Sequence, residues 1–193
     1  YDVTKGSVKV DGVDVRDMTQ KELRDKLGYV PQKGVLFSGT IDSNIRYGKP
    51  EITDAQVKEA AEVAQATEFI DTKPEKYKSP VSQGGTNVSG GQKQRLSIAR
   101  AIVKDPEIFI FDDSFSALDF KTDSQLRKAL KEYTKDATTV IVAQRISTIL
   151  GADQIIVLDD GHMAGIGTHK ELMANCEVYQ QIARSQLSEE ELA

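Results

Sequence analysis

The stretch that decides the fold is Asn87-Val-Ser-Gly-Gly-Gln-Lys-Gln-Arg95, with Ile108-Phe-Ile-Phe-Asp-Asp113 and Ser116-Ala-Leu-Asp119 after it. Its serine and the glutamine three residues later predict a helix start that contains two adjacent glycines. The apolar run that follows predicts a buried strand ending in paired acids. Free backbone N–H groups at a helix start and carboxylates at a strand end are an arrangement for holding a nucleotide triphosphate and its metal.

Working outward, strands alternate with helices in the second half of the chain. Residues 108–111 and 139–143 are apolar runs of strand length, which predicts strands covered on both faces, with a helix over 126–133 between them. This alternation favours an α/β fold with a parallel sheet. Residues 154–158 predict a further strand before a turn at Asp160-Gly161, and Thr168 with Glu171 predicts a C-terminal helix. Residues 188–193 read as a frayed acidic tail.

The N-terminal third predicts a small antiparallel piece followed by one strand. Residues 8–15 alternate around Asp11-Gly12, the pattern of a two-residue hairpin. Thr19 and Glu22 predict a capping box for a short helix, and residues 27–30 form a strand that Pro31 ends. Gln32 therefore comes directly after a strand.

The middle of the chain is mostly helical. Thr53 with Gln56 predicts a helix start, and Val57, Ala60, Ala61 and Ala64 share one face at helical spacing. Residues 73–88 are rich in Pro, Gly, Ser and Lys, which predicts a loop. The helix that opens at Ser89 is expected to bury Leu96, Ala99 and Ile102.

Composition limits the function classes. The 193 residues, 39% hydrophobic with a net charge of −5, can bury one substantial core. No block of Lys or Arg marks a nucleic-acid surface, so we expect no nucleic-acid partner. The single cysteine, Cys176, is expected to be structural and fits a reducing compartment. No apolar run approaches the roughly 18 residues that cross a bilayer, so any membrane role must come through other polypeptide.

Polar residues follow the predicted strands. Gln32, Asp112, Asp113 and Gln144 all stand at such strand ends, where open α/β sheets bind ligands. Asp112 is placed to hold Mg²⁺, because a small hard cation takes oxygen ligands and keeps much of its water. An isolated acid at this place would indicate instead a cap of the following turn.

The run from Ser89 to Ala101 resembles the signature motif and helix of ABC-transporter nucleotide-binding domains, with Val88 where Leu is usual. Four further segments resemble other motifs of the family: Gln32 the Q-loop, residues 108–112 Walker B, residues 116–119 the D-loop and residues 143–148 the switch loop. Residues 35–41 and 165–172 resemble the exporter branch, whose ATPase domain follows a transmembrane domain in one polypeptide.

The resemblance implies a RecA-like, mostly parallel core formed by residues 1–31 and 105–193, with a helical subdomain inserted over residues 32–104. It implies an ATPase that uses ATP and Mg²⁺, the metal being held by Asp112 and Gln32, with Asp113 and Gln144 at the catalytic positions. It also implies a set of ATP-binding residues: Gln32, Ser89, Gly90, Gly91, Gln92, Ser116 and Asp119.

Walker A is the motif that this chain lacks. No G-x-x-x-x-G-K-[ST] occurs, and the nearest string, Tyr47-Gly-Lys-Pro50, has neither the hydroxyl nor the first glycine. In the family this motif lies upstream of the residues that Tyr1-Asp-Val3 resembles, so we expect that the sequence starts inside the domain. Without the phosphate cradle, the isolated chain is expected to bind ATP weakly or not at all and to be inactive.

Two further departures weaken the expected catalytic site. Asp113 stands where the family has a glutamate, and its shorter side chain withdraws the carboxylate by roughly 1 Å, which can cost about 10²-fold in rate. Gln144 stands where the family has histidine, and it can donate a hydrogen bond but cannot carry a positive charge.

In the family, two such domains pair head to tail, and each ATP lies between the Walker motifs of one and the signature of the other. Asp113 and Gln144 would weaken this chain's own site, whereas Ser89-Gly-Gly-Gln92 would complete the partner's site. The pattern resembles one half of a heterodimeric exporter, placed at the cytoplasmic face of the cell membrane beside a transmembrane domain.

Three alternatives stay open from the sequence. One is a homodimeric exporter half with reduced ATPase activity, a second is a nucleic-acid-associated ATPase of the same superfamily, and a third is a noncatalytic module that docks a membrane partner. Gln83 either corresponds to the acidic residue of the exporters' cross-domain loop or is a solvated loop residue. The transported substrate is not encoded in this chain.

Overall fold

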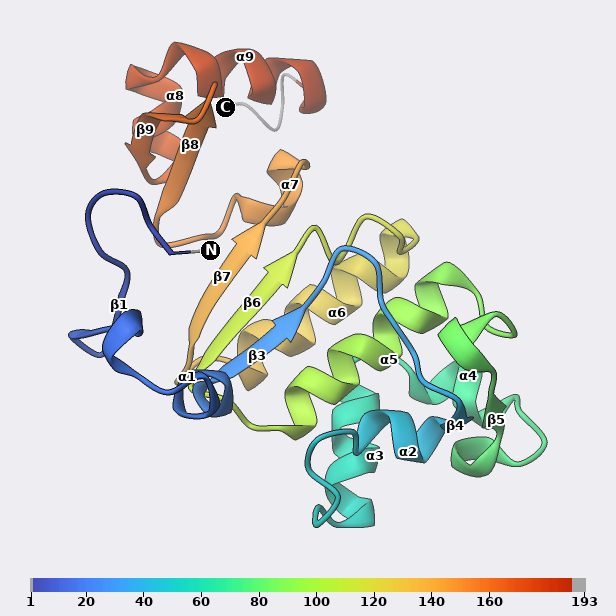
Figure 1. The fold of residues 1–193 in the computed structure, drawn as a ribbon. Helices are drawn as coiled ribbons and strands as arrows, with labels where there is room; N and C mark the ends of the chain where they lie inside the picture. The colour runs from blue at the N-terminus through green and yellow to red at the C-terminus, as the bar shows by residue number, and fades with distance from the viewer. Residues whose placement is uncertain (1, 189–193) are drawn as a thin grey trace. The chain divides into compact units, whose positions relative to one another are not determined.

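A computed structural model describes residues 2–188, which divide into two compact units, residues 2–142 and residues 143–188. The first unit is built on a three-stranded parallel sheet in the order β3 (Leu27–Val30), β6 (Ile108–Asp112), β7 (Thr138–Val142) (Figure 1). This confirms the α/β fold with its parallel sheet and flanking helices. β7 starts and ends one residue earlier than the apolar run predicts.

The central strand β6 divides the sheet into two faces by its alternation. Phe109 and Phe111 are almost fully buried, and their parallel rings lie 6.0 Å apart on one face. That face packs against α5 (Gly90–Val103) and α6 (Phe120–Tyr133), which supply Leu96, Ile98 and Leu126 to the same core. The aromatic pair therefore joins the sheet to both helices.

The opposite face of the sheet corrects one prediction. Val140 and Val142 of β7 are 45% and 52% exposed, and Tyr29 of β3 is 55% exposed. The sequence predicts strands covered on both faces, and for β7 this is wrong within residues 2–188. The physical reason is that α5 and α6 lie on the same side of the sheet, so these two helices shield one face only.

Helix starts follow the predicted caps. Each of the pairs Thr19–Glu22, Thr53–Gln56, Ser89–Gln92 and Thr168–Glu171 forms a complete capping box. These pairs begin α1 (Gln20–Lys26), α3 (Asp54–Val63), α5 and α8 (His169–Asn175). In such a box the two residues satisfy backbone N–H groups that the first helical turn leaves unpaired, so a local sequence pattern decides each start.

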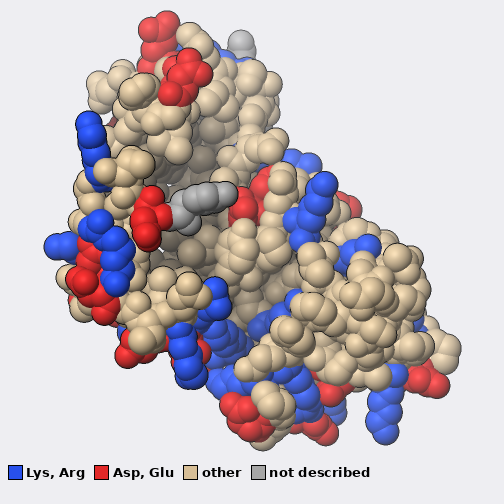
Figure 2. All heavy atoms as spheres, in the orientation of Figure 1, with Lys and Arg blue, Asp and Glu red and all other residues tan. Residues whose placement is uncertain are grey.

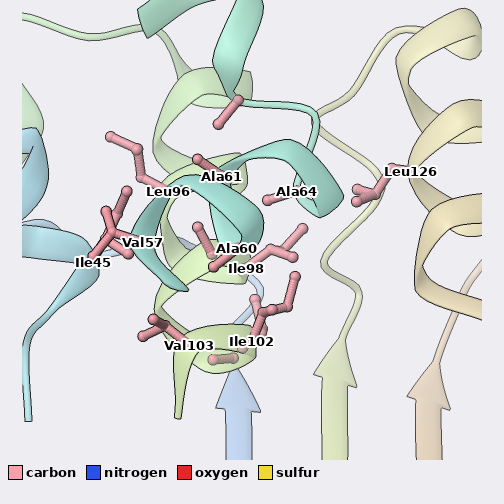
Figure 3. Packing of buried hydrophobic residues seen from close by; sticks show 14 of the residues in the cluster. Ile45, Val57, Ala60, Ala61, Ala64, Leu96, Ile98, Ile102, Val103 and Leu126 are labelled. Carbon is pink, nitrogen blue, oxygen red and sulfur yellow. The ribbon is translucent and has the colours of Figure 1, made fainter. Parts of the chain in front are cut away.

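A second layer of helices packs on α5. It consists of α2 (Ile41–Ile45) and α3, and the short helix α4 (Thr67–Asp71) packs in turn on α3. The predicted apolar face of α3 is buried, and Figure 3 shows Ala60 and Ala61 directed toward Leu96 and Ile98 of α5. Because alanine side chains are short, the backbones of α3 and α5 can approach closely along this seam.

The segment predicted as a loop over residues 73–88 contains short ordered elements. They are η2 (Lys76–Lys78), β5 (Pro80–Val81) and η3 (Gln83–Gly85), and β5 pairs antiparallel with β4 (Gly39–Thr40). This pairing joins the start of α2 to the middle of the predicted loop.

The predicted N-terminal hairpin is confirmed. It consists of β1 (Lys9–Val10) and β2 (Val13–Asp14), joined by Asp11 and Gly12 at φ 52° and 80°. Positive φ at both turn residues is typical of a type I′ hairpin. η1 (Val15–Asp17) follows it.

The second unit has its own small core. It contains α7 (Ile146–Ile149), the antiparallel pair β8 (Ile155–Asp159) and β9 (His162–Gly167), then α8 and α9 (Glu177–Gln186). The turn predicted at Asp160-Gly161 joins the two strands. Cys176 is buried in this core, which agrees with the structural role expected for it. The tail predicted as frayed lies outside the described residues except for Ser188.

In the part of the chain that the structure describes, no helix is both long and apolar enough to cross a membrane. The division into residues 1–31 with 105–193 and residues 32–104 stays a prediction.

Candidate functional site

The Ser-Gly-Gly turn stands at the start of α5. Ser89 accepts a hydrogen bond from the backbone of Gln92 (3.2 Å), and the Gln92 side chain accepts one from the backbone of Ser89 (3.1 Å). Gln92 is therefore occupied in the cap, while Ser89 and Gly90 are exposed. Apart from its chain neighbours and the helix's own backbone, no atom of the described residues lies within 4 Å of the place where a Gly90 Cβ would stand. The turn thus presents open backbone at the positive end of a 14-residue helix, which suits an anion.

This turn lies against the segment of residues 116–119. A Cβ added to Gly91 would stand 3.3 Å from the carbonyl oxygen of Ala117. Ser116 donates its hydroxyl to the backbone oxygen of Asp113 at 3.0 Å. Asp119 is the N-cap of α6, and the hydrogen bond that it accepts from Thr122 N lowers its pKa. The structure therefore brings the predicted signature and D-loop residues side by side in one unit.

The paired acids stand at the carboxyl end of β6 and differ in their surroundings. Asp112 accepts a hydrogen bond from the Tyr29 hydroxyl at 3.1 Å, across the neighbouring strand. Partial desolvation, and then this bond, raise the pKa of Tyr29, so the phenol stays protonated and remains a donor at neutral pH.

Asp113 turns out of the strand in a left-handed conformation (φ 44°). Its Oδ2 accepts a hydrogen bond from Gln32 Nε2 at 3.0 Å, and its backbone N–H donates to Val142 O at 2.9 Å. Gln32 and Asp113, 81 residues apart in sequence, thus meet at the predicted edge of the sheet.

Gln144 belongs to the second unit and is described with it. It is exposed, and its backbone oxygen accepts a hydrogen bond from Gln186 Nε2 at 2.8 Å. Gln186 Oε1 in turn accepts from Ile146 N at 2.9 Å, so α9 holds the backbone around Gln144. Its expected convergence with Gln32 and Asp113 stays a prediction.

The donor set at the sheet edge fits Mg²⁺. Among residues 2–188, no group of three or more His, Cys, Asp or Glu side chains could enclose a metal. Mg²⁺ does not need such a cage, because it commonly takes one or two protein oxygens and completes its shell with water and substrate phosphate. The carboxylate of Asp112 and the amide of Gln32 are oxygen ligands of that kind.

Three residues at this site escape sequence reasoning. Tyr29 bonds Asp112, and Gln94 bonds the backbone on both sides of Gln32. Arg95 donates to the backbone oxygens of Gln65 (2.7 Å) and Gly91 (3.4 Å) behind the signature turn. The sequence could have pointed to Gln94, because it is a polar residue among the apolar positions of the buried face of α5.

The face of the molecule shown in Figure 2 carries both positive and negative side chains. Lys and Arg side chains are interspersed with Asp and Glu there. Such a face differs from the stripe of a single sign that marks nucleic-acid binders.

Comparisons with known proteins agree with one another. The family described as "ABC transporter" matches residues 1–116. An uncharacterised ABC transporter ATP-binding protein of Mycobacterium bovis is 48% identical over 189 residues, which is 96% of this chain and 32% of the relative. A Staphylococcus aureus protein, provisionally named a multidrug export ATP-binding/permease protein, is 45% identical over 94% of this chain and 32% of its own length.

Among solved structures, a bacterial Atm1-family ABC exporter with ATP bound superposes with a TM-score of 0.94 at 40% identity, covering 98% of this chain and 33% of that one. The chain therefore spans about a third of the length of these relatives.

Proposed function

This chain belongs to the ABC transporter family, and from that membership we propose its function. It is an ABC exporter nucleotide-binding domain, and its work is to bind and hydrolyse ATP and thereby power export through a transmembrane domain. The acids at the end of β6, the glutamine after β3 and the signature turn on α5 all belong to one compact unit, which supports this proposal. The domain acts at the cytoplasmic face of the membrane.

The observation that carries the proposal is the hydrogen bond of Gln32 to Asp113, beside Asp112. Asp112 and the amide oxygen of Gln32 would hold Mg²⁺, which would neutralise charge on the phosphates when bound. Asp113 orients the attacking water, and Gln144 donates a hydrogen bond toward the γ-phosphate.

The signature turn serves a different nucleotide. The open backbone of Ser89, Gly90 and Gly91 faces the γ-phosphate of an ATP that a second nucleotide-binding domain holds, in a head-to-tail pair. Ser89 and Gly90 are exposed, which supports this role. A turn that bound only the ATP of this chain's own site would not need to be open toward solvent. Ala117 and Leu118 lie next to the turn, and Ser116 and Asp119, which flank them in the chain, join the same interface.

The two ATP sites of the pair are unequal. Asp113 has a shorter side chain than glutamate, and that side chain is already hydrogen-bonded to Gln32. Gln144 cannot become a cation, so it stabilises developing charge less than histidine would. This chain is therefore the half of a heterodimer that retains ATP at its own site and completes the hydrolytic site of its partner.

The test uses the full-length exporter with its partner, in which the partner's catalytic carboxylate has been removed. Asp113→Glu combined with Gln144→His is expected to raise ATP turnover at this chain's site by up to about 10²-fold, because the carboxylate regains its reach and the switch position regains a cation. The measurement is phosphate release by the purified pair.

The control is the same pair with Asp113→Asn and Gln144→His, which restores the imidazole without a catalytic carboxylate and should stay at background. Turnover that remains at background in the Glu/His pair as well would show that these two positions do not control the site.

A further inference from the structure

The segment that follows β3, residues 31–38, is held mainly by side chains. Asn44 of α2 pairs with both backbone groups of Phe37 at 2.9 Å, and Arg100 of α5 donates to Val35 O at 2.9 Å. Both of these side chains come from the helical layers. The path of the segment is therefore set by α2 and α5 and not by strand pairing.

Gln94 of α5 bonds the residues that flank Gln32 and Lys33. Its Nε2 donates to Pro31 O at 3.1 Å, and its Oε1 accepts from Gly34 N at 3.2 Å. One buried amide, 2% exposed, thus bridges the residues on either side of Gln32 and Lys33. A buried amide with both ends paired holds its partners in one geometry, because breaking either bond would leave a polar group unsatisfied.

The close approach of Gly34 to α5 supports the same interpretation. A Cβ at Gly34 would stand 2.6 Å from Ser97 Oγ and 3.0 Å from Lys93 O, so the backbone lies directly on the helix. Gln94 and Ser97 are one turn apart and face the same stretch of chain. The segment has little room to shift unless α5 moves with it.

A continuous chain of contacts runs from the signature turn to the acids. Ser89 and Gln94 are five residues apart on α5, about 7.5 Å along its axis. From Gln94 the chain passes through the peptide groups around Gln32, and Gln32 Nε2 then reaches Asp113. A displacement of the signature helix would therefore be carried to the side chain of Gln32.

We propose that Gln94 is a positioning residue for Gln32, and that it couples the signature helix to the metal and nucleotide site of this chain. The inference rests on the proposed function, since it assigns to Gln32 a role toward Mg²⁺ and ATP. Gln94 itself touches neither ligand. It acts by setting where the amide of Gln32 points.

The experiment uses the full-length exporter with its partner and the variant Gln94→Met, which keeps length and shape but removes both hydrogen bonds. Hydrogen exchange of the amides of residues 32–38, measured without nucleotide, is expected to become about tenfold faster, the equivalent of one lost hydrogen bond. Release of ATP from this chain's site is expected to become about tenfold faster with Mg²⁺ present and to change less than about twofold when Mg²⁺ is chelated.

Ser97→Ala is the matched control. It removes a buried hydroxyl from the same face of α5, one that has no hydrogen-bond partner among the described residues, so exchange and ATP release should stay as in the unmodified protein. Gln94→Glu is a second variant in case Gln94→Met does not fold. Its carboxylate can still accept from Gly34 N but cannot donate to Pro31 O, so this variant should show faster exchange at the amides of residues 32 and 33.

Two results would overturn the proposal. Unchanged exchange at the amides of residues 32–38 would mean that Gln94 does not hold the segment. Faster ATP release to the same extent with and without Mg²⁺ would mean that Gln94 has only a structural role. If the proposed function itself were wrong, the unmodified pair would retain no ATP at this chain's site. The exchange measurement would still decide whether Gln94 holds residues 32–38.

Discussion

At the scale of single residues, the candidate site depends on polar side chains that meet across the sheet. Tyr29 on β3 pairs in register with Ile110 on β6, and Asp112 lies two residues beyond Ile110 on the same face of the strand. This diagonal position is within reach of a long phenol side chain. The hydrogen bond that results fixes the orientation of the Asp112 carboxylate.

The variant Tyr29→Phe removes only the hydroxyl. Without the hydrogen bond the carboxylate of Asp112 is held less firmly, so the Mg²⁺ concentration that half-saturates ATP binding at this chain's site is expected to rise about three- to tenfold. The measurement is a Mg²⁺ titration of ATP binding by the full-length pair. Because the pKa of Tyr29 is raised, the hydroxyl stays protonated between about pH 6 and 8, and the effect should not vary over that range.

Tyr47→Phe is the matched control, since Tyr47 is similarly exposed (57%) and its ring stacks on Phe37, away from the acids. An unchanged Mg²⁺ midpoint in Tyr29→Phe would show that the phenol does not position Asp112.

At the scale of elements, the close seam between α3 and α5 supports the site. α5 carries the signature turn at its start and the residues that hold the segment after β3 along its length. Ala60 and Ala61 of α3, and Ala64 at its end, are almost fully buried (Figure 3). Small side chains on α3 therefore help to determine where α5, and with it the turn, can lie.

Ala61→Leu tests this seam. The added carbon atoms have no space at a residue that is 0% exposed, so the free energy of unfolding is expected to fall by about 1–3 kcal/mol. Denaturant unfolding measures the change. Lys58→Leu places the same apolar side chain at an exposed position of the same helix and should shift stability by less than about 0.5 kcal/mol. Equal effects of the two substitutions would contradict tight packing at the seam.

At the scale of the whole molecule, the proposed asymmetry assigns the strand-end residues and the signature turn of this chain to different ATP sites. Under this proposal, the acids and Gln32 serve its own site, and the turn at Ser89 serves the partner's site. Substitutions in the two places should therefore have unequal effects on the pair.

Gly91→Asp and Asp113→Asn compare these effects in the full-length pair. A carboxylate at the helix start repels phosphate and crowds Ala117 O, so Gly91→Asp is expected to lower steady-state ATP turnover by at least about tenfold. Asp113→Asn is expected to leave turnover within about twofold, because the partner's site performs most of the hydrolysis. The opposite order of effects would show that this chain's own site is the active one.

Local patterns explain why much of the fold is predictable. Capping boxes, the Asp11-Gly12 turn and the apolar run of β6 depend on residues a few positions apart, and each lies where expected. The short strand β5 escapes prediction, because its pairing with β4 joins stretches that are far apart in the sequence. The cover expected on β7 is wrong because burial depends on which elements pack on a face and not on the strand's own residues.

The sequence by itself determined the order of the motifs, the helix starts and the positions of the acids, because these are properties of short stretches of chain. Only the tertiary structure decided that Gln32 reaches Asp113, that Tyr29 bonds Asp112 and that Gln94 bonds the backbone on both sides of Gln32. Each of these contacts joins residues 60 or more positions apart. Hydrogen bonds need their partners within about 3 Å, and only the packing of α5 and β6 around β3 brings these groups that close.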